Sequence, residues 1–138
     1  MIRIAPLVLM IVPAAAAAAS SGDRTQDQLQ ACLAKPSGES TGGQTQCEAS
    51  AVHSYDQRLN AAYGELMRRL PANAAARLRS AQRAWLTFRA ADEAARSALY
   101  ATREGTMYVP MQAAASTDLV RERALQLEGL LRVMTIDD

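Results

Sequence analysis

A carboxylate at Asp56 and a guanidinium at Arg89 are the two groups whose types could support chemistry together. A carboxylate held by an arginine could act as a general base, but neither a second acid nor a histidine shares its helical face for proton transfer. The alternative is a polar network that orients two helices, because a paired arginine fixes register better than it adds stability. We favour this structural interpretation, and the predicted network comprises Asp56, Asn60, Tyr63, Gln82, Trp85 and Arg89.

The stretch from Ala81 to Arg89 contains the only Trp and the only Phe of the chain. Gln82, Trp85 and Arg89 are separated by three and four residues, so they lie on one face of a helix. An arginine beside the main aromatic side chain needs a carboxylate or amide partner if it is buried. We therefore expect this helix to pack on the helix that carries Asp56, and we expect the fold to be organised around this face.

The first 19 residues have the pattern of a secretory signal peptide. Arg3 precedes an apolar run from Ile4 to Val12, and small residues, mostly alanine, continue to Ala19. A membrane anchor is the alternative, but the uncharged run is shorter than the ~20 apolar residues that a spanning helix needs. We therefore predict a signal peptide over residues 1–19, a single mature domain over residues 20–138, and a periplasmic or secreted location.

Two cysteines, Cys32 and Cys47, fall in the mature part of the chain. In an exported protein an even number of cysteines indicates disulfide bonding, and two cysteines allow one pairing. A metal site with His53 is the competing interpretation, but two Cys and one His at irregular spacing lack a fourth ligand nearby. We therefore predict a disulfide between Cys32 and Cys47, no metal and no cofactor.

Composition and periodicity indicate an all-α fold for this chain of 138 residues. Apolar residues make up 49% of the sequence, much of it alanine, and no run of alternating apolar and polar residues predicts a strand. We expect a small helical bundle of three main helices plus a short N-terminal helix tied by the disulfide. The predicted helices cover residues 25–34, 45 or 46 to 70, 72–103, and 116 or 117 to near 134, with a loop over residues 104–112.

The charge balance argues against a nucleic-acid partner. Removing Arg3 with the signal peptide leaves 14 basic and 14 acidic residues, so the mature chain has no basic excess to meet a polyanion. A hydrolase is also rejected, because the sequence lacks a metal-ligand cluster, a Ser–His–Asp set and a convincing carboxylate pair. We therefore expect no catalytic residues and no enzymatic activity.

The motif Asp56-x-x-Leu59-Asn60-x-x-Tyr63, followed by Ala81-Gln82-Arg83-x-Trp85-x-x-Phe88-Arg89, resembles the LprI-type lysozyme-inhibitor family. The resemblance covers nearly all of the mature chain, from Cys32 through Gly105-Thr106-Met107-Tyr108 to Leu131. It implies an exported helical protein that binds and inhibits lysozyme. Many members of this family are short exported proteins of unknown function.

One feature departs from the family pattern. Members commonly carry two further cysteines, at positions that are held here by Glu93 and Ala115. The absence of both together fits the loss of one disulfide, which would tie the third helix to the loop before the fourth. We expect that loop to be less constrained in this chain.

The apolar stretch from Thr106 to Met111 is the candidate partner-binding loop. Its side chains have no predicted helix to pack on, and exposed apolar patches mark interaction sites, although these residues could instead cap the bundle. Tyr108 is the best anchor, because it combines a large apolar area with a polar tip. The candidate residues are Thr106, Met107, Tyr108, Val109 and Met111.

Two functional hypotheses remain open from the sequence. The first is an inhibitor-like binding protein that acts in the periplasm or cell envelope and whose partner is a lysozyme. The second is a structural or adaptor domain of the envelope that binds another protein, for which the marker would be an exposed apolar helix face. Both hypotheses require a protein partner, and neither requires a membrane span after signal cleavage.

Overall fold

The computed structural model describes residues 22–136, so the predicted signal peptide over residues 1–19 lies outside the described residues. The described chain is helical, and no strand occurs between residues 22 and 136. The predicted class is therefore confirmed, with three main helices and a short N-terminal one. The elements are α1 (Arg24–Leu33), the 3-10 helix η1 (Pro36–Gly38), α2 (Thr41–Arg69), α3 (Ala72–Tyr100) and α4 (Tyr108–Val133).

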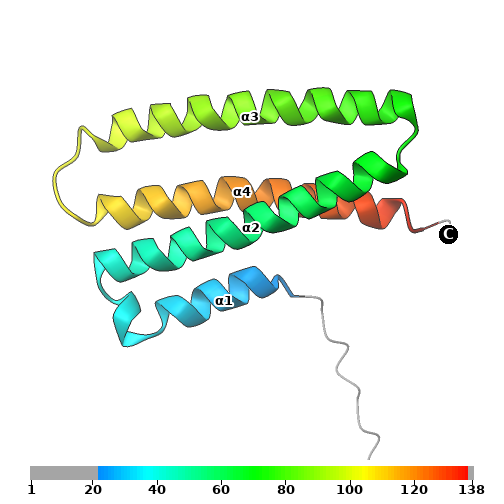
Figure 1. Ribbon diagram of the computed structural model, residues 1–138. Helices are drawn as coiled ribbons and strands as arrows, with labels where there is room; N and C mark the ends of the chain where they lie inside the picture. The colour runs from blue at the N-terminus through cyan, green and yellow to red at the C-terminus, as the bar shows by residue number, and fades with distance from the viewer. Residues whose placement is uncertain (1–21, 137–138) are drawn as a thin grey trace, which may run out of the picture.

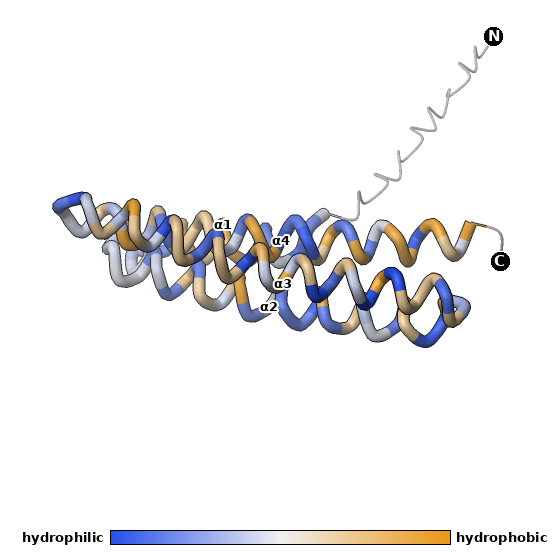
Figure 2. Tube along the Cα trace, turned by 90° about the horizontal axis from the view of Figure 1, so that it is seen from above, coloured by the Kyte–Doolittle hydropathy of each residue, from blue (hydrophilic) through white to orange (hydrophobic). Residues whose placement is uncertain are grey.

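The helices α2 and α4 run side by side in the same direction, because α3 carries the chain back along the bundle (Figure 1). Their packing against each other is the most extensive in the molecule, and α1 packs along α2 (Figure 1). Seen from above, the helices form a narrow, elongated bundle (Figure 2). Parallel neighbours need such a crossover, so α3 serves as a long connection between the two helices that build the core.

The core is a seam between α2 and α4. Its buried positions follow one another at steps of three or four residues on each helix, which is the spacing of a single helical face. Tyr55, Val120 and Leu127 have no exposed surface, and Leu66 is 1% exposed. The α2–α4 seam comprises Ala51, Tyr55, Leu59, Ala62 and Leu66 of α2 with Thr117, Val120, Ala124 and Leu127 of α4.

The expectation that the fold is organised around the stretch from Ala81 to Arg89 is wrong. Only Ala75 and Gln82 of α3 are buried, and Phe88 is 54% exposed. Trp85 is half-buried and packs at the edge of the seam. Helical spacing predicts which side chains share a face, but it does not say how deeply that face is covered, and α2 is covered mainly by α4.

The helix α2 begins at Thr41, four residues before the first predicted start at residue 45. Two glycines follow Thr41 and suggest a loop, but the hydroxyl of Ser40 accepts a hydrogen bond from the Gly43 amide at 3.0 Å and caps the helix. Gly43 is required there by space, because a Cβ at this position would lie 1.7 Å from the carbonyl oxygen of Ser37. The glycine therefore permits the tight entry into the helix.

The helix α4 begins at Tyr108, whereas the sequence predicted a loop up to residue 112 and a cap at Ser116 or Thr117. Pro110 is the third residue of the helix, where a missing N–H costs nothing because the first four amides have no intrahelical partner. Thr117 lies inside the helix, and its hydroxyl donates to the Ala113 carbonyl at 3.2 Å. The connection between α3 and α4 is therefore short, and Gly105 has a φ of +107° within it.

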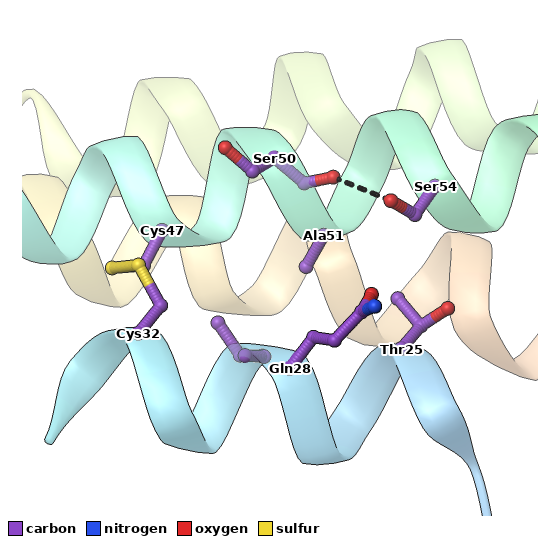
Figure 3. Close-up of a pocket in the computed structure, with 8 residues that line it drawn as sticks. Thr25, Gln28, Cys32, Cys47, Ser50, Ala51 and Ser54 are labelled. Atoms are coloured by element: carbon purple, nitrogen blue, oxygen red, sulfur yellow. Dashed lines mark hydrogen bonds between the residues drawn. A yellow bond between two sulfur atoms is a disulfide. The ribbon is translucent and has the colours of Figure 1, made fainter.

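The predicted disulfide between Cys32 and Cys47 is present and joins the end of α1 to the second turn of α2. Figure 3 shows the two half-cystines bridging the two helices. The bond closes a segment of 15 residues that includes η1. This constraint holds α1 against α2, where Leu29 contributes the buried apolar contact of α1 to the core.

Replacing both cysteines by serine is expected to lower the free energy of unfolding by roughly 3 kcal/mol, because the cross-link closes a segment of 15 residues in the unfolded chain. Urea unfolding of wild type and of the double variant measures the difference. Mass spectrometry of non-reduced peptides gives the control. Two free thiols in the wild-type protein would contradict the pairing.

Two substitutions on α4, Leu127→Ala in the seam and Leu130→Ala at the surface, test how much each position contributes to the free energy of unfolding. Leu127 is 0% exposed, so its truncation should cost about 2–5 kcal/mol in the free energy of unfolding. Leu130 is 47% exposed, so its truncation should cost about 0.5 kcal/mol or less. Equal losses in urea unfolding would show that the α2–α4 seam is not the core.

Candidate functional site

The predicted pair of Asp56 and Arg89 is formed across α2 and α3, with 3.2 Å between Oδ1 and Nη1. Nε of Arg89 also donates to Glu93, one turn further along α3, at 3.0 Å. The Asp56 side chain is 44% exposed, so water screens the pair and limits its contribution to stability. The pair therefore sets how α3 lies on α2 more than it strengthens the fold.

Gln82 and Trp85 attach α3 to α4 through Arg123, a residue that the predicted network did not include. Oε1 of Gln82 accepts a hydrogen bond from Nε of Arg123 at 3.0 Å. The guanidinium groups of Arg89 and Arg123 lie 5.7 and 5.9 Å from the centre of the Trp85 ring. Cation–π contacts at such distances contribute about 0.5–1 kcal/mol at exposed sites. Polar and aromatic contacts thus hold α3 against α2 and α4, because α3 does not bury a broad apolar face.

A groove of about 280 Å³ between α2 and α3 is lined by this network. Tyr63 is half-buried against the seam, whereas Asn60 is exposed, so Asn60 does not belong to a buried core. Asp56 is the only carboxylate that lines the groove, it is already paired with Arg89, and the lining contains no His or Cys. Within the groove, Asp56 therefore serves as the ion-pair partner of Arg89.

A hydrogen bond links α3 to α4 at position 115, which holds an alanine in this chain. Nη1 of Arg96 donates to the carbonyl oxygen of Ala115 at 2.7 Å. Asp92, one turn before it, forms an ion pair with Arg96 at 3.0 Å. Because the acceptor is a main-chain carbonyl, this hydrogen bond does not depend on which side chain occupies position 115. This contact ties the ends of α3 and α4 together.

A second polar cluster, which the sequence analysis missed, joins α1, α2 and α4 around Asp23. The carboxylate of Asp23 accepts hydrogen bonds from Tyr55 at 2.7 Å, from Arg58 at 2.5 Å and from Arg121 at 2.8 Å. It also caps α1 by accepting from the amide of Gln26 at 3.5 Å. Three helices therefore converge on one carboxylate.

Arg58 extends this cluster to Glu128 on α4. Its Nε and Nη2 donate to the two carboxylate oxygens of Glu128, each at 2.8 Å, so the pair is bidentate. The guanidinium also lies over the ring of Tyr55, 5.1 Å from its centre. Bidentate charge-assisted hydrogen bonds are the strongest and most directional that side chains make. The Asp23 cluster, defined as Asp23, Tyr55, Arg58, Arg121 and Glu128, therefore fixes the register of α2 on α4.

The contacts of Asp23 shift the pKa values of the groups around it. Burial alone would raise the pKa of Asp23, but hydrogen bonds from Arg121, Arg58 and Tyr55 outweigh it and hold that pKa well below its usual range. Burial, with the hydrogen bond to Asp23, raises the pKa of the Tyr55 hydroxyl to about 12. Asp23 lies directly before α1 and caps it, and an Asp in this place is a sequence signal for the start of a helix.

Neither the disulfide region nor His53 offers a ligand site. A cavity of about 60 Å³ lies between α1 and α2, with Gln28, Ser50 and Ser54 among its lining residues (Figure 3). Such a volume holds only a few water molecules. His53 is exposed and contacts Gln57 at 3.0 Å, and no group of three or more His, Cys, Asp or Glu between residues 22 and 136 could hold a metal ion.

The predicted partner-binding loop forms the entry to α4. We refer to its five residues, Thr106, Met107, Tyr108, Val109 and Met111, as the α4 entry patch. Met107, Val109 and Met111 are 59%, 55% and 48% exposed, which leaves three large apolar side chains in water. Tyr108 is half-buried, and its ring lies tilted by 49° against the ring of Tyr100, with 6.3 Å between ring centres. The patch is therefore exposed in part and anchored by one tyrosine.

These features define a small disulfide-bonded helical bundle with two polar clusters that hold its helices and with an exposed apolar patch where α4 begins. The chain belongs to the lysozyme inhibitor LprI family, whose model matches residues 32–127. A crystal structure of an uncharacterised protein from Burkholderia thailandensis is similar, with 36% sequence identity and a TM-score of 0.75. The similarity covers 80% of this chain and 54% of that one, so the chain spans about half of its length. No protein of curated function matches the sequence.

Asp23→Asn is expected to lower the free energy of unfolding at pH 7 by about 1.5–3 kcal/mol, because it removes the charge that three donors share. The pKa of Asp23 is lowered in the folded state, so its contribution is present above the unfolded pKa of about 3.9 and is lost below it. The difference between wild type and variant should therefore hold from pH 7 to pH 5 and shrink below pH 4.

Urea unfolding at several pH values measures this difference. Asp27→Asn is the matched control, since Asp27 is exposed in the first turn of the same helix. If the two variants lose equal stability, or if the Asp23→Asn difference is the same at pH 3 and pH 7, the Asp23 cluster does not have the role assigned to it.

Proposed function

We propose that this protein is exported and acts in the periplasm or cell envelope, where it binds a lysozyme and inhibits it without catalysing a reaction. The observation that carries the proposal is membership of the LprI family over residues 32–127, which include all of α2 and α3. The polar network that could have supported catalysis is occupied by internal contacts between helices. A binding role therefore agrees with what the described side chains do.

Export is supported by two further features. Residues 1–19 have the pattern of a signal peptide, and a disulfide such as Cys32–Cys47 persists in oxidising compartments outside the cytoplasm. Among the described residues, none of the helices combines the length and the apolar character that crossing a bilayer would require. The leader-like pattern and the disulfide favour a mature domain over residues 20–138 that follows a cleaved signal peptide.

The α4 entry patch is the proposed contact surface. Its apolar side chains are exposed, and methionine adapts its shape to a partner better than branched side chains do. The network of Asp56, Gln82, Trp85 and Arg89 is engaged in holding α3, so replacing those residues would disturb the fold together with any contact. Thr106 and Tyr108 complete the patch, and the tyrosine supplies an aromatic ring with a polar tip.

A turbidity assay of cell-wall lysis tests the proposal. Several classes of lysozyme are incubated with cell walls, with and without the purified mature domain. We expect the domain to slow clearing by at least one lysozyme in proportion to its concentration. Unchanged clearing by every lysozyme at a large excess of the domain would reject the inhibitor function.

Val109→Ser is expected to weaken inhibition about tenfold, which corresponds to ~1.4 kcal/mol of binding free energy, because it removes exposed apolar area from the patch. Its melting temperature should stay near that of wild type, since Val109 is 55% exposed. Val133→Ser is the matched control at the other end of α4, where the valine is 61% exposed. Equal inhibition by both variants would place the contact elsewhere.

The adaptor hypothesis remains a second candidate, because α3 carries the exposed apolar side chains that would mark it. Phe88 and Leu99 lie eleven residues apart on one face of this helix, and they are 54% and 55% exposed. Phe88→Ser separates the two functions. It should leave lysozyme inhibition unchanged if the α4 entry patch makes the contact, and it should abolish binding of an envelope protein if α3 is the docking face.

A further inference from the structure

A cavity lies directly beside the α4 entry patch, and Met107 and Met111 of the patch are among its lining residues. It has a volume of about 570 Å³, is open to the surface, and is lined by the end of α1, by η1, and by the first turns of α2 and α4. This is the end of the bundle at which α2 and α4 both begin (Figure 1). The lining residues are Leu33, Gly38, Thr41, Gln44, Glu48, Met107, Pro110, Met111 and Ala114.

Glu48 is the only ionisable side chain that lines this cavity, and no Lys, Arg or His lies among the lining residues. The residue is 7% exposed, and its Oε2 is buried without a hydrogen bond from the residues described. The nearby hydroxyl of Thr117 donates to the main-chain carbonyls of Glu48 and Ala113, at 3.4 and 3.2 Å, and leaves the carboxylate free. A buried carboxylate oxygen without a donor is costly, so the site favours an incoming donor.

We propose that this cavity receives a long basic side chain, Lys or Arg, of the bound protein, and that its cationic group pairs with Glu48. This proposal rests on the proposed function, because it assumes that a protein binds at the α4 entry patch. It specifies that this protein presents a positively charged side chain there. Lys and Arg bury their methylene stems along apolar walls while the charged end reaches a polar partner. The walls here are supplied by Leu33, Pro110, Met107 and Met111.

The dimensions and the flexibility of the cavity suit such a side chain. Small-molecule sites occupy roughly 300–1,000 Å³, so 570 Å³ accommodates one extended side chain. Oε2 of Glu48 has almost no exposed surface, so neighbouring side chains must move when the cation enters. Met107 and Met111 are exposed at the rim and unbranched, and they can repack around the inserted chain. A charge-assisted hydrogen bond to Glu48 would then select a cation over a neutral group of equal size.

Methyl NMR of the methionine side chains tests the site without any lysozyme. The full mature domain is titrated with n-pentylammonium, which imitates a lysine side chain, and with 1-pentanol, which has the same stem without the charge. We expect saturable shifts of the Met107 and Met111 methyl signals with the ammonium and at least tenfold weaker binding of the alcohol. Equal binding of both probes, or no saturable shift with either, overturns the proposal.

Glu48→Gln removes the charge and keeps the shape, so it should weaken pentylammonium binding at least tenfold. Glu39→Gln is the matched control, because Glu39 is exposed at the same end of the bundle and does not line the cavity. Ala114→Leu fills the cavity without changing its charge, and it should also abolish the methyl shifts. Binding that survives both Glu48→Gln and Ala114→Leu overturns the proposal.

Assays of lysozyme inhibition by the same variants distinguish failure of the cation site from failure of the proposed function. With a lysozyme that wild type inhibits, Glu48→Gln should raise the inhibition constant about tenfold or more, and Glu39→Gln should leave it unchanged. Full inhibition by Glu48→Gln overturns the cation site and leaves the inhibitor function standing. If wild type inhibits no lysozyme, the proposed function fails, and the pentylammonium titration still supports or overturns the cation site.

Discussion

Buried side chains of α2 and α4 interlock along one parallel seam, and each of the other elements is attached to it. Tyr55 of α2 shows how the attachment works, because its ring is buried in the seam while its hydroxyl donates to Asp23 beside α1. Arg58 reaches the same carboxylate and also Glu128 on α4. An apolar seam tolerates sliding by a helical turn, whereas directional ionic contacts do not, so the Asp23 cluster supplies the register.

The attachment of α3 follows a different principle. The helix buries little apolar surface. Its contacts include the pair of Arg89 with Asp56, the hydrogen bond between Arg123 and Gln82, and the contacts of both arginines with the Trp85 ring. Such contacts orient a helix more than they stabilise it. The buried apolar contact on which local stability depends is therefore concentrated in the seam rather than on α3.

The sequence predicted the helical class, the disulfide and the Asp56–Arg89 pair, because each depends on local pattern or on residue chemistry. It did not predict that α4 covers α2 more fully than α3 does, because amphipathic spacing marks a face but not its partner. The start of α4 was missed because the apolar stretch over residues 104–112 was expected to be a loop, although Pro110 is accommodated in the first helical turn. Asp23 was missed because its partners, Arg58 and Arg121, are 35 and 98 residues away in sequence.

The residues that stabilise the fold and the residues proposed to bind a partner lie in different parts of the bundle. The seam and both polar clusters lie along the body of the bundle, whereas the α4 entry patch and the Glu48 cavity lie at the end where α2 and α4 begin. Hydrogen–deuterium exchange of the mature domain with and without a lysozyme tests this division most directly. Slower exchange over residues 41–48 and 105–114, with α3 unchanged, is the predicted result. Slower exchange along α3, or no change at the end of the bundle, would contradict it.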